Sequence, residues 1–100
     1  MSHDAFVEFE TRAKADGFDE VVSRDWAPAQ VVPVHTHPFE ARALVVAGEM
    51  WLTVGEETQH ISTGGTFHLD PHVRHSERYG HEGATYWVAR RNDKPAQVSA

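Results

Sequence analysis

Two histidines stand one residue apart in the segment His35-Thr36-His37. Pro33 and Pro38 flank this segment and prevent a helix there, so an extended strand is expected. Alternate residues of a strand point to the same side of a sheet, which brings the two imidazoles close enough to share an ion. Imidazole is a good ligand for zinc, iron, nickel, copper and manganese. The segment is therefore predicted to supply part of a metal site.

A second stretch of the chain, residues 64–75, is also rich in histidine. It combines a Gly64-Gly65 turn, a short strand over Thr66 to Leu69, a stop at Pro71 and a histidine, His75. In a closed barrel such a strand can run beside the first segment and bring His75 onto the same ion. The chain has no cysteine, so every ligand must be an imidazole or an oxygen group. The prediction is one divalent transition metal: zinc, iron, nickel or manganese.

The overall composition narrows the class of protein. A chain of 100 residues suits one domain, and its 15 acidic and 9 basic residues give a formal net charge of −6. This acidic balance argues against nucleic acid and against anionic membranes as partners. No run approaches the roughly 20 apolar residues of a membrane span, and residues 1–17 are too charged for a signal peptide. A cytoplasmic protein is expected.

The N-terminal segment is predicted to be a short helix over Ser2 to Asp16. Phe6, Phe9 and Ala13 recur near helical spacing and give one apolar stripe, and Gly17 follows the last turn. The stripe is expected to pack against the rest of the domain or against a partner subunit. The segment carries no residues that indicate chemistry.

From Phe18 onward, short strand-like runs alternate with turn residues. Gly48-Glu49 predicts a hairpin between strands over residues 43–46 and 50–54, and Gly80 with Gly83 predicts a turn between strands over 76–79 and 84–90. Further turns are expected at residues 55–57 and 64–65. Roughly seven or eight strands without helices between them indicate an antiparallel β-barrel or sandwich. The expected organisation is a helix over 1–17, a barrel over 18–92 and a loose tail over 93–100.

The spacing of these residues resembles the first motif of the cupin superfamily. That motif reads Gly, five residues, His-x-His, three or four residues, Glu, six residues, Gly. His35, His37 and Gly48 occupy its histidine and closing glycine places, while Ala29 stands in the place of the first glycine.

The second cupin motif reads Gly, five residues, Pro-x-Gly, two residues, His. Gly65 and Pro71 match it, and His75 matches if the loop after Pro71 is one residue short. The resemblance covers Ala29 to His75, and the chain is similar to a small single-domain cupin. It implies an all-β jelly roll, also called a double-stranded β-helix, with a short N-terminal helix added and a metal held by His35, His37 and His75.

The chain departs from the first motif at its carboxylate. Counted back from Gly48, the glutamate place holds Ala41. A common family variant reads His-x-His-Pro-x-Glu-Gln, and in that register Glu40 matches the glutamate that is not a ligand. Glu40 is kept as the candidate fourth ligand, beside the alternative that it is an exposed or supporting carboxylate.

Five further residues are predicted to line the pocket: Arg42, Trp51, His68, His72 and Tyr86. Arg42 shares strand parity with Leu44 and Val46, which favours an inward position, with a surface position as the alternative. His72 or Val73 stands where the second motif has its inner glycine, so His72 is also a possible substitute ligand. His68 is expected to line the pocket or face solvent. The large aromatic residues are either pocket walls or plain core.

Two functions are compatible with these residues. Three histidines leave coordination places open, which is typical of a catalytic metal, and the resemblance allows dioxygenases, isomerases and cyclases acting on a small polar molecule. No general base is evident and no catalytic residue can be assigned, which favours the alternative of a non-catalytic module that binds or senses a small ligand. The residues do not decide whether the protein is an enzyme. No organic cofactor is indicated. A homodimer is expected, because an open sheet edge seeks a partner.

Overall fold

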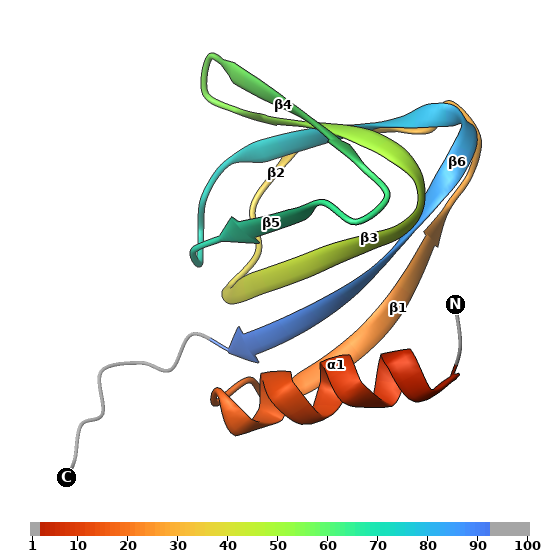
Figure 1. Cartoon of the computed structure of the whole chain (residues 1–100). Coiled ribbons are helices and arrows are strands. Elements are labelled where there is room, and N and C mark those ends of the chain that lie inside the picture. Colours follow the sequence, from red (N-terminus) through yellow and green to blue (C-terminus); the bar gives the residue numbers. More distant parts are fainter. Residues whose placement is uncertain (1–2, 93–100) are drawn as a thin grey trace, which may run out of the picture.

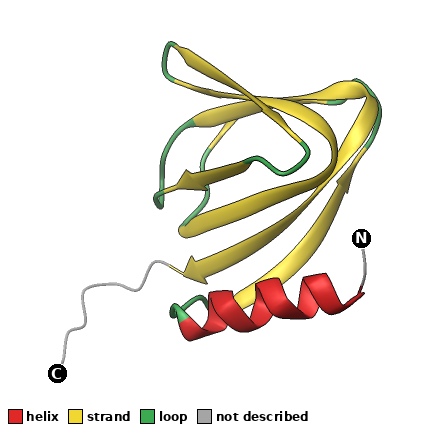
Figure 2. Ribbon diagram, in the orientation of Figure 1, coloured by secondary structure: helices red, strands yellow, loops and turns green. Residues whose placement is uncertain are grey.

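The computed structural model describes residues 3–92, so the predicted tail over 93–100 lies outside the described residues. One helix is followed by six strands in the described part of the chain. Their bounds are α1 His3–Ala15, β1 Glu20–Trp26, β2 Val31–His35, β3 Phe39–Val54, β4 Glu57–Ser62, β5 Thr66–Leu69 and β6 His75–Asn92. The predicted N-terminal helix is present (Figure 2).

The two long strands β3 and β6 form the centre of the sheet and pair antiparallel along most of their length. β1 and β2 pair with the outer side of β6, and β4 and β5 pair with the outer side of β3. Both long strands bend, so the sheet curls around its own apolar face (Figure 1). The predicted all-β jelly roll with a short N-terminal helix is confirmed.

The bend replaces the two predicted turns at Gly48 and Gly83, so both turn predictions were wrong. β3 and β6 each continue through these positions as one bent strand, without a chain reversal. Both glycines have positive φ, 75° and 77°. A Cβ on Gly48 would lie 2.2 Å from the carbonyl oxygen of Gly83, and one on Gly83 would lie 2.4 Å from the carbonyl oxygen of Trp26. These glycines therefore allow neighbouring backbones to approach closely, and they do not reverse the chain.

The bend also changes which residues face the core. In β3, Val45 is buried before the bend and Met50 after it, so the inward positions change from odd to even numbers. In β6, Tyr79 is buried before the bend and Tyr86 after it. The β3–β6 register shifts between residues 45 and 47 and again between 48 and 50, which is the mark of β-bulges. Counting alternate residues along β3 across residue 48 therefore cannot tell which side chains face the core.

The turns predicted at residues 55–57 and 64–65 are confirmed. Gly55, at φ 61°, lies between β3 and β4, and Gly64, at φ 94°, lies between β4 and β5. Both positions have the left-handed backbone that a tight turn requires and that glycine adopts without steric cost.

Helix α1 packs on the outside of the sheet, below β1 and β6 in Figure 1. The ring of Trp87 on β6 contacts Phe6 and Phe9 of the predicted apolar stripe, at centroid distances of 5.2 and 5.9 Å. Ala13 is buried with Phe18 in the same small cluster. Of the two surfaces considered for the stripe, the barrel is the one it contacts. This helix is too short and too polar to cross a membrane.

Candidate metal centre

The three predicted histidines converge at one end of the barrel. His35 ends β2, His75 begins β6, and the two residues are paired across these strands. His37 follows in the connection to β3. The ring centroids of His35 and His75 are 4.2 Å apart, those of His37 and His75 are 4.9 Å apart, and those of His35 and His37 are 6.2 Å apart. The predicted meeting of imidazoles from two separate segments is present, and their binding of a metal stays a prediction.

Each of the three rings is held by a hydrogen bond from its Nδ1 to a backbone carbonyl. The acceptors are Pro33 for His35, Phe39 for His37 and Val73 for His75, at 2.9, 3.0 and 2.8 Å. A carbonyl oxygen can only accept, so Nδ1 carries the proton and Nε2 of a neutral ring keeps its lone pair. Burial is the main reason that the pKa of His37 is lowered, and the nearby charges of His75 and His35 add to the effect. This arrangement is typical of metal-binding histidines.

A carboxylate that the sequence analysis missed completes the cluster. Glu77 lies two residues after His75 on the same face of β6, and only 6% of it is exposed. Its Oε2 is 3.5 Å from Nε2 of His35 and 3.7 Å from Nε2 of His75. One donor atom from each of these three residues lies within 4.8 Å of the others. Strand alternation from His75 was the signal for Glu77, but the motif directed attention to a carboxylate after His37.

The surroundings of Glu77 test whether this cluster suits a metal. A buried carboxylate is costly unless a cation or hydrogen bonds compensate it. Among the described residues, the partners of Glu77 are two imidazoles and the hydroxyls of two tyrosines, and none of these groups is a permanent cation. Imidazole nitrogens with one carboxylate oxygen form a donor set that suits a divalent transition metal. The residues present therefore fit the metal that the fold family implies.

Two tyrosines orient the Glu77 carboxylate from the other side. The hydroxyl of Tyr79 donates to Oε1, and that of Tyr86 lies 3.4 Å from the same oxygen. Burial is the main reason that the pKa of Tyr79 is raised, with Tyr86 and the charge of Glu77 adding to it. Burial and then Glu77 raise the pKa of Tyr86 to about 12. Both phenols therefore stay protonated at neutral pH and hold Oε1, while Oε2 faces the imidazoles.

The cluster faces a cavity of about 320 Å³ inside the barrel. Besides the three histidines, Glu77 and Tyr86, its walls are Arg24, Trp26, Phe39, Ala41, Phe67, Leu69, Val88 and Arg90. This volume is at the small end of the range for small-molecule sites, and mostly apolar walls with a few polar groups are usual for such sites. Of the five predicted pocket residues, Tyr86 is the one that lines this cavity.

The structure places Glu40 away from the histidines. Phe39 and Ala41 line the cavity, so Glu40, which lies between them on β3, points to the other face. Its Oε2 is 2.6 Å from Nε2 of His68, and its Oε1 accepts a hydrogen bond from Nε of Arg91 at 2.9 Å. The hydrogen bond from His68 and then those from Arg91 lower the pKa of Glu40. The expectation that Glu40 turns inward is corrected, because strand alternation and two partners hold it outside.

The other predicted pocket residues also lie outside the cavity. Nη2 of Arg42 is 2.8 Å from a carboxylate oxygen of Asp16, and its guanidinium lies over Phe18 beside the helix. The parity argument assigned it to the wrong face, because the small residues at 41 and 43 are the buried ones. Trp51 stacks on His60 outside the barrel, at a centroid distance of 4.7 Å, and His68 is the partner of Glu40.

Two residues that stand in the glycine places of the cupin motifs have left-handed backbone. Ala29 has φ 57° and His72 has φ 67°. The backbone N–H of His72 donates to the carbonyl of His37 at 2.8 Å, which ties the two histidine segments together. His72 does not line the cavity. The loop thus keeps the backbone shape that a glycine would adopt, and His72 acts through its main chain.

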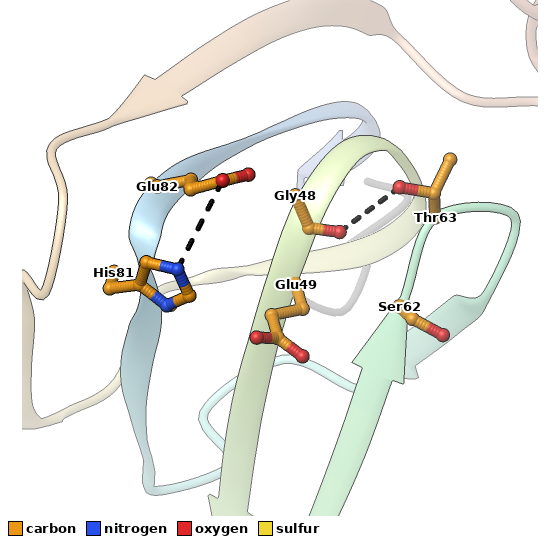
Figure 3. Close-up of a pocket in the computed structure, with 8 residues that line it drawn as sticks. Gly48, Glu49, Ser62, Thr63, His81 and Glu82 are labelled. Atoms are coloured by element: carbon orange, nitrogen blue, oxygen red, sulfur yellow. Dashed lines mark hydrogen bonds and ion pairs between the residues drawn. The ribbon is translucent and has the colours of Figure 1, made fainter.

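A second hollow, of about 380 Å³, lies where the two long strands bend (Figure 3). Its polar side chains include Glu49, Thr63, His81 and Glu82. Glu49 pairs with His60 at 2.7 Å, and the His81 side chain is 86% exposed and 4.0 Å from Glu82. Solvent reaches these groups freely, and the histidine cluster does not contribute to this hollow.

A family model for the cupin domain matches residues 24–89, well over half of the chain. The chain belongs to the cupin family. The matched region contains all three converging histidines and Glu77, so the resemblance inferred from the two motifs is confirmed. Membership in this cupin family gives the fold, while the family hosts many different activities.

Solved structures share the cupin fold of this chain. A protein of unknown function from Rhizobium leguminosarum bv. viciae 3841 has a TM-score of 0.68 and 18% identity, over 72% of this chain and 68% of the other. An RmlC-like cupin from Shewanella frigidimarina NCIMB 400 has a TM-score of 0.62 and 23% identity, over 79% of this chain and 68% of the other. The DMSP lyase DddQ from Ruegeria pomeroyi DSS-3 has a TM-score of 0.63 and 23% identity, over 73% of this chain and 36% of the other. No curated protein matches the chain. Identities this low show the fold alone.

Proposed function

We propose that this cupin holds one divalent transition metal with His35, His37, His75 and Glu77, and that it is a metal-dependent enzyme acting on a small polar molecule. The observation that supports the proposal is a buried carboxylate facing imidazoles whose rings are fixed by backbone hydrogen bonds. The enzymatic cupin with a similar fold, DMSP lyase, is consistent with such a role. Zinc, iron, nickel and manganese all accept this donor set.

The metal, when bound, would polarise a substrate oxygen or activate water or dioxygen, according to its identity. The chain's own residues hold the ligands and shape the cavity. Tyr79 and Tyr86 fix one oxygen of Glu77, and apolar side chains such as Phe67 and Leu69 limit the entry of water. With a pKa of about 12, Tyr86 stays protonated and cannot act as a base at neutral pH.

The alternative function is a non-catalytic module that binds or senses a small ligand. One observation favours it: the titratable cavity residues other than the arginines are the four proposed ligands and Tyr86. In the described part of the chain, this leaves the cavity without a separate general base. An enzyme of this kind would have to use a metal-bound group for proton transfer.

Metal analysis of protein purified without a histidine tag tests the first half of the proposal. About one metal per chain is expected for wild type and for His68→Ala, whereas His75→Ala should lose it. His68 is a suitable control because it is an imidazole of the same barrel that does not face the cavity. Equal metal content in both variants would refute the assignment.

Turnover assays of the iron-, nickel-, zinc- and manganese-loaded protein test the second half. Oxygen uptake and product formation are followed with a panel of small chelating acids and diols. Turnover that is lost in His75→Ala supports the enzyme. Saturable binding without turnover of any candidate favours the sensing module.

The proposal keeps the homodimer and the cytoplasmic location expected from the sequence. Among the described strands, β2 pairs with β6 alone, and it exposes 64% of Val31 and 57% of Val34, a surface that a second copy could cover. Light scattering at micromolar concentration should give twice the chain mass of 11.2 kDa, and a monomer mass would contradict the dimer.

A further inference from the structure

Two arginines line the same cavity as the histidine cluster. They lie on adjacent strands, Arg24 on β1 and Arg90 on β6. Each is an even number of residues from another cavity residue of its own strand, Trp26 on β1 and Tyr86 on β6, so it points to the same face. Arg24 makes no ion pair or hydrogen bond with a described residue, and its guanidinium lies over the Trp26 ring at 4.8 Å. The chain as a whole is acidic, so two cationic groups on one cavity wall are notable.

The wall also contains a buried polar hydrogen without an acceptor. Nε of Arg90 is buried and makes no hydrogen bond within the described structure, and the buried indole N–H of Trp26 has only the Tyr86 hydroxyl as a nearby acceptor among the described residues. Nη1 of Arg90 is 3.4 Å from Glu20, which leaves Nε unsatisfied. Buried donors normally find an acceptor in a native protein, because leaving them unpaired costs free energy. The unpaired Nε–H of Arg90, on the same cavity wall as the Arg24 guanidinium, therefore points to an acceptor that enters from outside the chain.

The aromatic contacts of the arginines do not occupy these donors. The guanidinium carbons of Arg24 and Arg90 lie above the rings of Trp26 and Phe39, each at 4.8 Å. A cation–π contact uses the flat face of the guanidinium, whereas its N–H bonds point outward in the plane of the group. The aromatic rings thus position the arginines and leave their edges available for planar, bidentate recognition of a carboxylate.

We infer that the ligand of this cavity is a small carboxylic acid, bound as its anion by Arg24 and Arg90, with its other polar atoms toward the histidine cluster. This inference rests on the proposed function in taking the metal cavity as the ligand site. A carboxylate is favoured over a phosphate because the cavity is small, Glu77 already adds a negative charge, and Glu20 already shares one edge of Arg90. A planar carboxylate with a single negative charge suits the size and the net charge of this cavity.

Titration of the ¹⁵N-labelled full chain by NMR tests the inference, both metal-free without chelator and loaded with Zn²⁺. The probes are acetate, malonate and benzoate, each compared with its neutral amide, and inorganic phosphate. At least one carboxylate should shift the Arg90 Nε–H and Trp26 indole signals saturably, while its amide does not. The variant Trp26→Phe identifies the indole signal.

Charge variants decide whether the arginines are responsible. Arg24→Gln and Arg90→Gln should each weaken carboxylate binding about tenfold, the usual effect of losing a charge-assisted hydrogen bond. Arg78→Gln is the matched control, because Arg78 lies over Trp51 outside the cavity and its loss changes the net charge equally. Glu20→Gln should strengthen binding, since it frees an edge of Arg90.

Any of the following would overturn the inference: amides that bind as well as carboxylates, phosphate that binds more tightly, or an Arg78→Gln effect equal to that of Arg90→Gln. An absence of saturable shifts in both the metal-free and the Zn²⁺-loaded protein would also overturn it. Failure of the metal proposal gives a different pattern. In that case zinc does not bind, but carboxylate binding to the metal-free chain still depends on Arg24 and Arg90.

Discussion

Two groups of histidine and carboxylate side chains in this cupin are each close enough to reach a single ion. We define the inner cluster as His35, His75 and Glu77, and the outer cluster as Glu40, His68 and Asp70. Both contain imidazole and carboxylate donors at similar separations. They differ in burial and in what already neutralises the carboxylate.

In the inner cluster, His75 and Glu77 are almost fully buried, and the cations available to Glu77 among the described residues are imidazoles that must be protonated to help. In the outer cluster, the side chains of His68 and Asp70 are 49% and 74% exposed, and Arg91 already pairs with Glu40. Water screens charges in the exposed group, and a fixed guanidinium repels a metal cation. Ligand types and distances therefore do not separate the two clusters, whereas a buried carboxylate without a permanently charged partner favours the inner cluster as the proposed metal site.

The largest difference between the two clusters is expected in zinc affinity when one carboxylate is removed from each. Glu77→Gln should weaken zinc binding by about a hundredfold, since it removes the charged ligand and leaves only neutral donors. Glu40→Gln should leave zinc affinity unchanged. Calorimetric titration of both variants with Zn²⁺ measures the difference, and a large effect of Glu40→Gln would make the outer cluster the metal site.

The metal-free protein should respond to Glu77→Gln in the opposite way. Without a cation the buried carboxylate is a cost, and the amide can still accept from Tyr79, so the free energy of unfolding should stay equal or rise. A large loss of stability without metal would instead identify Glu77 as a structural residue.

The outer cluster should affect how the stability of the protein depends on pH. Hydrogen bonds from His68 and then from Arg91 lower the pKa of Glu40 below the 4.5 of an ordinary glutamate. The stabilisation that the ionised Glu40 carboxylate contributes is therefore fully present above pH 4.5. It is lost as the pH falls through the lower pKa that Glu40 has in the folded protein. Urea unfolding from pH 3 to 7 should show that wild type is more stable than Glu40→Gln at neutral pH, and that this difference shrinks on acidification. Glu82→Gln is the control, because its carboxylate is 82% exposed.

The smallest expected effect tests whether stability and metal binding are independent. Ala29 has φ 57°, a backbone conformation that costs a residue with a Cβ about 1 kcal/mol or more. Ala29→Gly should raise the free energy of unfolding by up to about 1 kcal/mol, after the greater freedom of glycine in the unfolded chain is counted. Its zinc affinity should equal that of wild type. A change in zinc affinity would show that the strained turn takes part in positioning the inner cluster.

Much of the site could be predicted because its signals are local. His35 and His37 stand at alternate positions of a strand bounded by prolines, and His75 follows a turn, a strand and a stop. Glu77 needed one further step of the same alternation from His75, but the sequence does not show that this face of the strand is buried. No position was predicted for Arg24 or Arg90, because nothing in their neighbours along the chain indicates a cavity.

The sequence by itself determined the class of fold, the helix, the turns at residues 55–57 and 64–65 and the identity of the histidines that meet. Only the tertiary structure decided which carboxylate joins them. Gly48 and Gly83 bend two long strands together where separate hairpins were expected, and the bulges at that bend exchange inward and outward positions. Which side chains share the interior therefore depends on contacts between distant segments, and residue spacing along one strand cannot encode them.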